Sequence, residues 1–191
     1  IIMLVPMRAI LDAADKNGYA QGAFNVNAVC QVKAAVDVHQ ILRSPAIIQG
    51  ADLANGFMGG RTDFANSTLE DKKAGAKNIG AAVKKYAADS DIPVALHLDH
   101  GKNFDSCIAA IEGGYTSVMI DGSSLPFDEN VELTREVVKY AHERGVTVEG
   151  ELGVLAGVED HVFAATSTYT NPLSAIDFFK KTGVDALAIS Y

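Results

Sequence analysis

The sequence predicts an α/β fold, a (β/α)8 barrel of which about the first six strands are present. Short apolar runs alternate with amphipathic helical patterns along the 191 residues. The runs are almost continuously apolar, which is typical of parallel strands buried on both faces. Helices between successive strands indicate βαβ units with right-handed crossovers. A doubly wound open sheet is the less favoured alternative, because no Gly-rich phosphate motif follows the first run, FNVN.

Each predicted element follows from its local pattern. Strands are expected where an apolar run carries no Pro beyond its first two residues, and helices where apolar residues recur at helical spacing. Gly145 and Gly183 are C-terminal stops for the last two helices. The predicted strands are 22–27, 44–50, 93–101, 117–123, 146–153 and 185–191. The predicted helices are 27–43, 104–114, 129–144 and 174–183, with one more within 1–18. Residues 71–86 are expected to form the solvated face of a helix, and residues 153–172 a loop.

The strand count also predicts the domain organisation. A complete eight-stranded barrel usually takes about 250 residues. A sheet of six strands would leave two long edges without partners. We therefore expect residues 1–191 to form a single barrel domain that is incomplete at its C-terminal side.

Composition favours a small-molecule enzyme in a reducing, cytoplasmic setting. No apolar run approaches the roughly 18 to 20 residues of a membrane span, and residues 1–18 lack the pattern of a signal peptide. The net charge of −8 argues against nucleic acid and anionic membrane surfaces as partners. Cys30 and Cys107 lie in helical patterns, which favours two small buried side chains over a disulfide.

Polar side chains gather at the carboxyl ends of the predicted strands, where barrels carry their active sites. Asp99 and His100 end the third strand, and Asp121 and Glu151 end the next two. Three carboxylates without a cation would repel one another and raise their own pKa values. Imidazole with carboxylates suits zinc or a similar divalent ion, so the pattern predicts a metal site. The simpler alternative is a set of hydrogen-bonded core residues, and His97 is assigned such a packing role or one behind the ligands.

Three segments of the chain carry a family resemblance. They are HLDHG (97–101), VMIDGSSLPFDENVELTREVVKYAHERGVTVEGELG (118–153) and LAGVED (155–160). They resemble the class II, metal-dependent fructose-1,6-bisphosphate aldolases, to which tagatose-bisphosphate aldolases are close relatives. The resemblance implies a (β/α)8 barrel and reversible cleavage of fructose 1,6-bisphosphate to dihydroxyacetone phosphate and glyceraldehyde 3-phosphate. It also implies a catalytic Zn²⁺, a phosphorylated sugar substrate and a cytoplasmic homodimer or homotetramer.

The resemblance assigns roles to residues around the third strand. Asp99 matches the family's proton donor and acceptor at the aldehyde or C4 hydroxyl oxygen, and would act catalytically. His100 matches a ligand of the catalytic zinc. Asn25, in FNVN, resembles a residue that contacts the ketose substrate.

Further acidic residues take roles from the same resemblance. Asp121 and Glu151 match positions where a second or displaced cation, divalent or monovalent, can bind. Glu159 falls in the family's mobile loop, where an acid of this type helps to move the proton of the carbon acid. Gly153 and Gly157 are the expected hinges of that loop.

The chain departs from the family pattern at several positions. Ala51 stands where many members carry a Ser near the substrate, and Val158 stands where a second loop acid often lies. Two further zinc histidines of the family would follow Tyr191. Aldolases of the Schiff-base type are disfavoured, because none of the predicted strands contains a Lys to form the imine.

Three alternatives stay open beside fructose-bisphosphate aldolase activity. Tagatose 1,6-bisphosphate differs from the fructose sugar only at C4, and the sequence does not choose between them. A non-catalytic truncated fragment could bind sugar phosphates or associate through exposed barrel edges. A metal amidohydrolase is the least favoured, because GAFNVN (22–27) offers no His-x-His motif.

Overall fold

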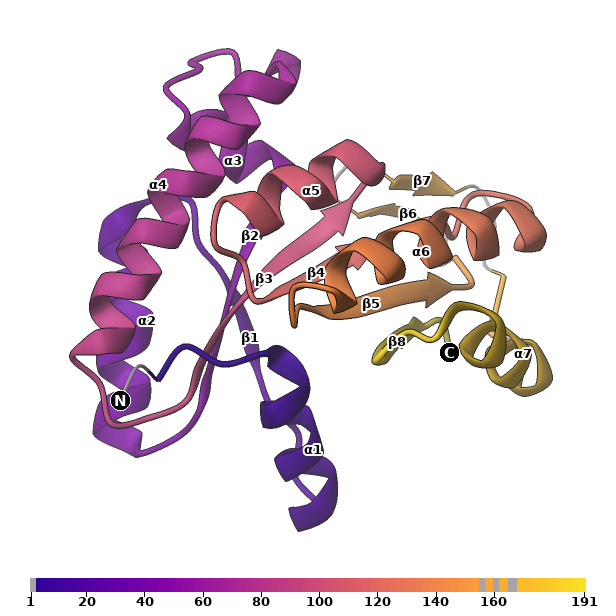
Figure 1. The fold of residues 1–191 in the computed structure, drawn as a ribbon, viewed down its shortest axis with the longest axis horizontal. Coiled ribbons are helices and arrows are strands. Elements are labelled where there is room, and N and C mark those ends of the chain that lie inside the picture. Colours follow the sequence, from indigo (N-terminus) through magenta and orange to yellow (C-terminus); the bar gives the residue numbers. More distant parts are fainter. Residues whose placement is uncertain (1–2, 155–156, 160–161, 165–167) are drawn as a thin grey trace.

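The computed structural model describes residues 3–154, 157–159, 162–164 and 168–191. Its main sheet curls and contains six parallel strands in the order β1–β2–β3–β4–β5–β8 (Figure 1). Each strand pairs with the next one to enter this sheet, whereas a doubly wound sheet reverses its order at a switch point. The sheet is therefore a partial (β/α)8 barrel, and the predicted fold class is confirmed.

Helices connect these strands along the chain (Figure 1). The strands of the main sheet are β1 (Ala23–Asn25), β2 (Ala46–Ala51), β3 (Val94–Gly101), β4 (Ser117–Ile120), β5 (Thr147–Leu152) and β8 (Ala186–Ile189). The helices are α1 (Met7–Asn17), α2 (Val29–Leu42), α3 (Asp52–Met58), α4 (Leu69–Ala88), α5 (Phe104–Glu112), α6 (Phe127–His142) and α7 (Pro172–Thr182), with a 3-10 turn η1 (Phe64–Asn66). Among the described residues, no helix is long and apolar enough to cross a membrane.

The segment after β5 differs from its prediction. The loop expected over 153–172 contains an antiparallel hairpin of β6 (Gly157–Glu159) and β7 (Val162–Ala164). Val158 and Phe163 occupy opposite positions in its register. β-Branched and aromatic residues favour strands, which gives the physical reason for this difference.

The main core lies between the sheet and the outer helices. Along β3, Leu96 and Leu98 are fully buried in it, and Ile79 and Val83 of α4 belong to the same cluster. The solvated face expected over 71–86 is thus only one side of α4. On the other side, Gly75 lies so close to α3 that a Cβ atom would approach the Asn55 carbonyl oxygen to 1.7 Å.

The inner face of the sheet is covered near its amino end by α1, which stands apart from the other helices (Figure 1). Met7 and Ile10 pack there against Ile47 of β2 and Ala95 of β3. Each apolar side chain buried in this way contributes about 1.5–3 kcal/mol. The cluster therefore attaches the first helix to the barrel interior.

The two cysteines have different environments. Cys107 is buried, as predicted, whereas Cys30 is exposed and the burial expected for it is wrong. The buried face of α2 consists of Val32, Val36 and His39, and Cys30 lies on a different face of the helix. Both thiols are free, so the prediction that they form no disulfide is confirmed.

Asp185 joins three elements at the amino end of the barrel. Its carboxylate accepts hydrogen bonds from Arg8 of α1 at 2.9 Å and from the Val148 amide of β5 at 2.8 Å, and lies 2.9 Å from His142 Nε2 of α6. Burial raises the pKa of Asp185, but the bonds from Val148, His142 and Arg8 outweigh burial and hold it below its ordinary value. The charged form of Asp185 therefore stabilises the fold.

We predict that Asp185→Asn destabilises the protein by about 1.5–3 kcal/mol at pH 7, the range for hydrogen bonds to a charged group. Because the folded-state pKa is lowered, this stability is present above the unfolded value of about 3.9 and is lost as pH falls through the folded value. Urea unfolding of both proteins from pH 7 to pH 3 measures the difference. Asp177→Asn, which removes an exposed pair with Lys181, is the control and should change stability by less than about 1 kcal/mol. A difference that grows on acidification would contradict the account.

Candidate metal centre and catalytic residues

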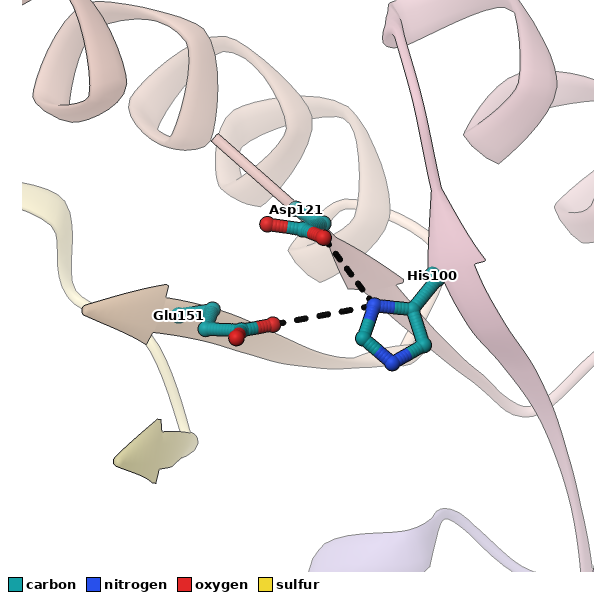
Figure 2. Close-up of side chains that lie close together, drawn as sticks. All are labelled: His100, Asp121 and Glu151. Carbon is teal, nitrogen blue, oxygen red and sulfur yellow. Dashed lines mark hydrogen bonds and ion pairs between the residues drawn. The ribbon is translucent and has the colours of Figure 1, made fainter. Parts of the chain in front are cut away.

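Three neighbouring strand ends bring His100, Asp121 and Glu151 together. His100 lies near the end of β3, Asp121 follows β4, and Glu151 lies near the end of β5. Figure 2 shows the three side chains pointing toward one another. One ligand atom from each lies within 4.8 Å of the others, and all three residues are half-buried. The residues predicted as metal ligands therefore form one cluster.

A bulge in β3 gives His100 its position. Between the pairs Leu98–Val118 and Gly101–Ile120, β3 has one more residue than β4. His100 lies within this bulge and has a φ of 48°, in the left-handed region that residues other than Gly rarely adopt. In a regular strand Asp99 and His100 would face opposite sides of the sheet. The bulge instead brings the imidazole of His100 to the carboxylate that ends β4.

Gly101 makes the close approach after the bulge possible. A Cβ atom at this position would lie 2.6 Å from the Met119 carbonyl oxygen and 3.0 Å from Cys107 Sγ. No side chain fits without moving the backbone of β4. The last residue of HLDHG is therefore a steric requirement of the site.

The imidazole of His100 is paired with two carboxylates. Its Nδ1 lies 3.0 Å from Asp121 Oδ2 and 3.7 Å from Glu151 Oε2 (Figure 2). The hydrogen bond to Asp121, together with the nearby charges, exceeds the opposing effect of burial and raises the pKa of His100 to about 9. For Asp121, burial raises the pKa, but hydrogen bonds from His100 and Ser123 outweigh it and lower the pKa below its ordinary value. The carboxylates of Asp121 and Glu151 thus favour positive charge beside them, which the protonated imidazole of His100 supplies in this structure and which a metal ion could supply in its place.

Asp99 lies beside this cluster and contacts Asn25. The side-chain amide of Asn25 donates a hydrogen bond of 2.8 Å to Asp99 Oδ2, which links β1 to β3 across β2. The residue predicted to move a proton and the one predicted to contact substrate therefore meet. An amide donor fixes the carboxylate orientation and leaves its other oxygen for a further partner.

The position of Glu159 is only partly described. Its backbone lies in β6, paired with Val162 of β7, and its side chain lies outside what the structure describes. Its catalytic role remains a prediction. Of the two expected hinges, Gly153 has a φ of 90°, whereas Gly157 begins β6.

The sequence pattern did not assign a role to Ser123. Its backbone amide and hydroxyl both donate to Asp121 Oδ1, at 3.0 and 2.6 Å. These bonds orient the carboxylate so that Oδ2 faces His100. The signal lies in the spacing Asp-Gly-Ser, because Asp side chains commonly accept from the backbone two residues later.

His97 belongs to a buried polar layer below the cluster. It is 2% exposed, its Nδ1 lies 2.7 Å from Ser117 Oγ, and its Nε2 lies 3.2 Å from Glu149 Oε2. Both ring nitrogens are therefore partnered within the barrel. These contacts are those of a packed, hydrogen-bonded core residue, which is one of the two roles expected for His97.

The fold and this donor set define a class of protein: a parallel barrel with a candidate metal centre at the carboxyl ends of its strands. One imidazole and two carboxylates are a donor set that suits zinc. The family model "Fructose-bisphosphate aldolase class-II" matches residues 5–191. The chain belongs to the class II fructose-bisphosphate aldolase family.

Individual relatives agree with this membership. The fructose-bisphosphate aldolase of Treponema pallidum is 48% identical over 191 residues, which cover 98% of this chain and 54% of the relative. The fructose-bisphosphate aldolase of Geobacillus stearothermophilus is 41% identical over 187 residues, covering 97% of this chain and 60% of the relative. The chain thus spans little more than half the length of these curated relatives.

Solved structures show the same fold. The YdjI aldolase of Escherichia coli K12 matches with a TM-score of 0.76 and 30% identity, covering 98% of this chain and 60% of that protein. The fructose-bisphosphate aldolase of Campylobacter jejuni matches with a TM-score of 0.78 and 24% identity, covering 97% and 56%. At 24% identity, the likeness to the Campylobacter jejuni protein shows the shared fold alone.

We predict that His100→Ala weakens zinc binding by more than about 100-fold, because even residues behind metal ligands cost 10- to 100-fold when changed. Competition titration with a chromophoric chelator measures the zinc dissociation constant. His142→Ala is the control, since His142 lies on the partly exposed surface of α6 and should leave zinc affinity unchanged. Wild-type affinity in His100→Ala would remove this residue from the ligand set.

Proposed function

We propose that the chain supplies the proton shuttle and part of the metal centre of an aldolase that reversibly cleaves fructose 1,6-bisphosphate to dihydroxyacetone phosphate and glyceraldehyde 3-phosphate. Family membership and the names of the relatives support the reaction class. The observation that carries the proposal is the Asn25–Asp99 contact next to the cluster of His100, Asp121 and Glu151. A carboxylate oriented beside a cation site suits proton transfer at an oxygen that the cation binds.

Asp99 acts on the C4 hydroxyl of the ketose. In cleavage it accepts the hydroxyl proton as the C3–C4 bond breaks, and the bonding electrons remain on the C3 side. In condensation it returns the proton to the same oxygen. Asn25 holds the carboxylate in place throughout, and Glu159 is proposed to handle the proton at carbon from β6.

Zinc is the proposed cofactor, with His100 as a ligand and Asp121 and Glu151 as acidic ligands or as the site of a second cation. When bound, the ion acts as a Lewis acid that stabilises negative charge on the substrate oxygens by several kcal/mol. The protein contributes the orientation of the donors. Ser123 orients Asp121, and the bulge orients His100.

The substrate and setting follow from the family. Relatives named fructose-bisphosphate aldolase favour the fructose sugar over the tagatose sugar. A phosphorylated sugar is an anion, so an acidic chain of net charge −8 needs local cations to hold it. We propose a cytoplasmic enzyme that assembles as a homodimer or homotetramer.

Two exposed apolar stripes support closure of the barrel by further βα units. α2 follows β1 at one end of the sheet, and α7 precedes β8 at the other. Both helices carry large apolar side chains in solvent. These are Val38, Ile41 and Leu42 on α2, and Leu173, Ile176 and Phe179 on α7. Within the described residues, β1 and β8 each pair on one side only, so both the sheet and the helical layer stop at the same two places.

We predict that a co-expressed polypeptide corresponding to the part of the Treponema pallidum relative outside the matched region binds this chain. The stripes on α2 and α7 would be covered, since each buried apolar side chain contributes about 1.5–3 kcal/mol. Size-exclusion chromatography of the co-purified pair measures the complex. Ile41→Lys and Phe179→Lys should weaken it by at least tenfold, whereas Tyr19→Lys, at an exposed residue that belongs to neither α2 nor α7, should not. Equal binding by all variants would contradict the closure.

The catalytic assignment is tested by Asp99→Ala in catalytically active protein. We expect cleavage of fructose 1,6-bisphosphate to fall by about 10²- to 10⁴-fold, the usual contribution of a general acid–base group. Zinc affinity should persist, because Asp99 lies outside the ligand cluster. A coupled assay for dihydroxyacetone phosphate and a zinc titration measure the two effects. Loss of zinc together with activity would refute the assigned role, and so would full retention of activity.

A further inference from the structure

Asn130 of α6 is a buried polar residue that the reaction does not use. It is 1% exposed, and it lies near the start of the helix that connects β4 to β5. An amide at such a position costs several kcal/mol unless its groups are hydrogen-bonded. The hydrogen bonds of Asn130 therefore indicate its role in the barrel.

Asn130 bonds to the backbone of a proposed metal ligand. Its Nδ2 donates a hydrogen bond of 2.8 Å to the carbonyl oxygen of Glu151. The β4–β5 ladder ends one residue earlier, at the Ile120–Gly150 pair. The side chain of Asn130 thus supplies a donor for β5 just beyond the last residue of β4.

Thr134 fixes the direction of this amide. Its hydroxyl donates to Asn130 Oδ1 at 3.1 Å, one turn further along α6. An amide whose oxygen accepts from Thr134 must turn its nitrogen toward Glu151. Thr134 is itself 0% exposed, so water does not compete for this bond.

Asn130 also packs against the turn that carries Asp121. A Cβ atom on Gly122 would lie 2.3 Å from Asn130 Oδ1 and 3.3 Å from Asn130 Cα. Gly122 stands between Asp121 and Ser123, whose hydroxyl holds the Asp121 carboxylate. One buried side chain therefore touches the backbone next to Asp121 and the backbone of Glu151.

We propose that Asn130 is a positioning residue that sets the separation of the Asp121 and Glu151 carboxylates for cation binding. The inference rests on the proposed metal site. Asn130 contacts neither carboxylate and acts through the two backbones.

Asn130→Ala and Thr134→Val test the inference in the purified protein with zinc alone as the probe. Zinc dissociation constants come from competition titration, and unfolding free energies come from urea titration without zinc. Asn130→Ala should weaken zinc by about 10- to 100-fold, as for residues behind metal ligands. Thr134→Val should weaken zinc binding less than Asn130→Ala does. Thr134→Ser, which retains the hydroxyl, should keep the wild-type zinc affinity.

Asn78→Ala is the matched control. Asn78 of α4 donates the same kind of bond, to the Met58 carbonyl oxygen at 2.8 Å, but its partner carries no proposed ligand. It should leave zinc affinity unchanged. If the Asn130→Ala and Thr134→Val proteins lose stability but bind zinc like the wild type, the positioning role is overturned and the metal site is not. A wild-type protein that binds no zinc would overturn the metal site and the positioning role together. Thr134→Val, the milder change, decides the matter if Asn130→Ala does not fold.

Discussion

The extra residue in β3 is the constraint on which the site depends. Regular alternation would separate Asp99 from His100, one toward the barrel interior and the other toward the helices. A left-handed conformation at His100 removes that separation, at a cost of about 1–2 kcal/mol for a residue with a Cβ atom. Contacts of the imidazole with Asp121 and Glu151 offset this cost, and Gly101 leaves room for the chain to continue. Strain of this kind is common where a backbone holds functional groups.

The interior of the barrel becomes more polar from its amino end to its carboxyl end. Ala95 packs against α1 in an apolar layer, and His97 forms the next layer with Ser117 and Glu149. Asp99 follows beside the candidate metal centre. This gradient explains how a strand that begins as a buried apolar run carries His97, Asp99 and His100 in its second half. His97, Asp99 and His100 each contact a polar side chain within the barrel, which offsets part of their desolvation cost.

Sequence patterns predicted the strand order and the residues at the strand ends because both follow from short-range rules. Parallel strands buried on two faces have an unmistakable composition, and their carboxyl ends meet. The contact between Asn25 and Asp99 follows from the same rule. The bulge at His100 was not predicted, because it depends on the register between β3 and β4 rather than on the residues of either strand.

Packing across elements explains the remaining differences. The buried side of α4 depends on small residues such as Gly75. The need for a small residue there is visible only once α3 is known to pack against it. The role of Asn130 is similar, since an asparagine in the first turns of a helix is ordinary until its amide meets Glu151. The hairpin of β6 and β7 was mistaken for a loop, because each of its strands has only three residues.

Anomalous diffraction at the zinc absorption edge, from crystals of the zinc-loaded protein, tests the central claim most directly. The account predicts a peak about 2.0–2.2 Å from a nitrogen of His100 and from an oxygen of Asp121 or Glu151. It also predicts that His100 keeps its left-handed conformation and that Asn25 still bonds to Asp99. A peak that His100 does not contact, or a regular β3 without the extra residue, would contradict it.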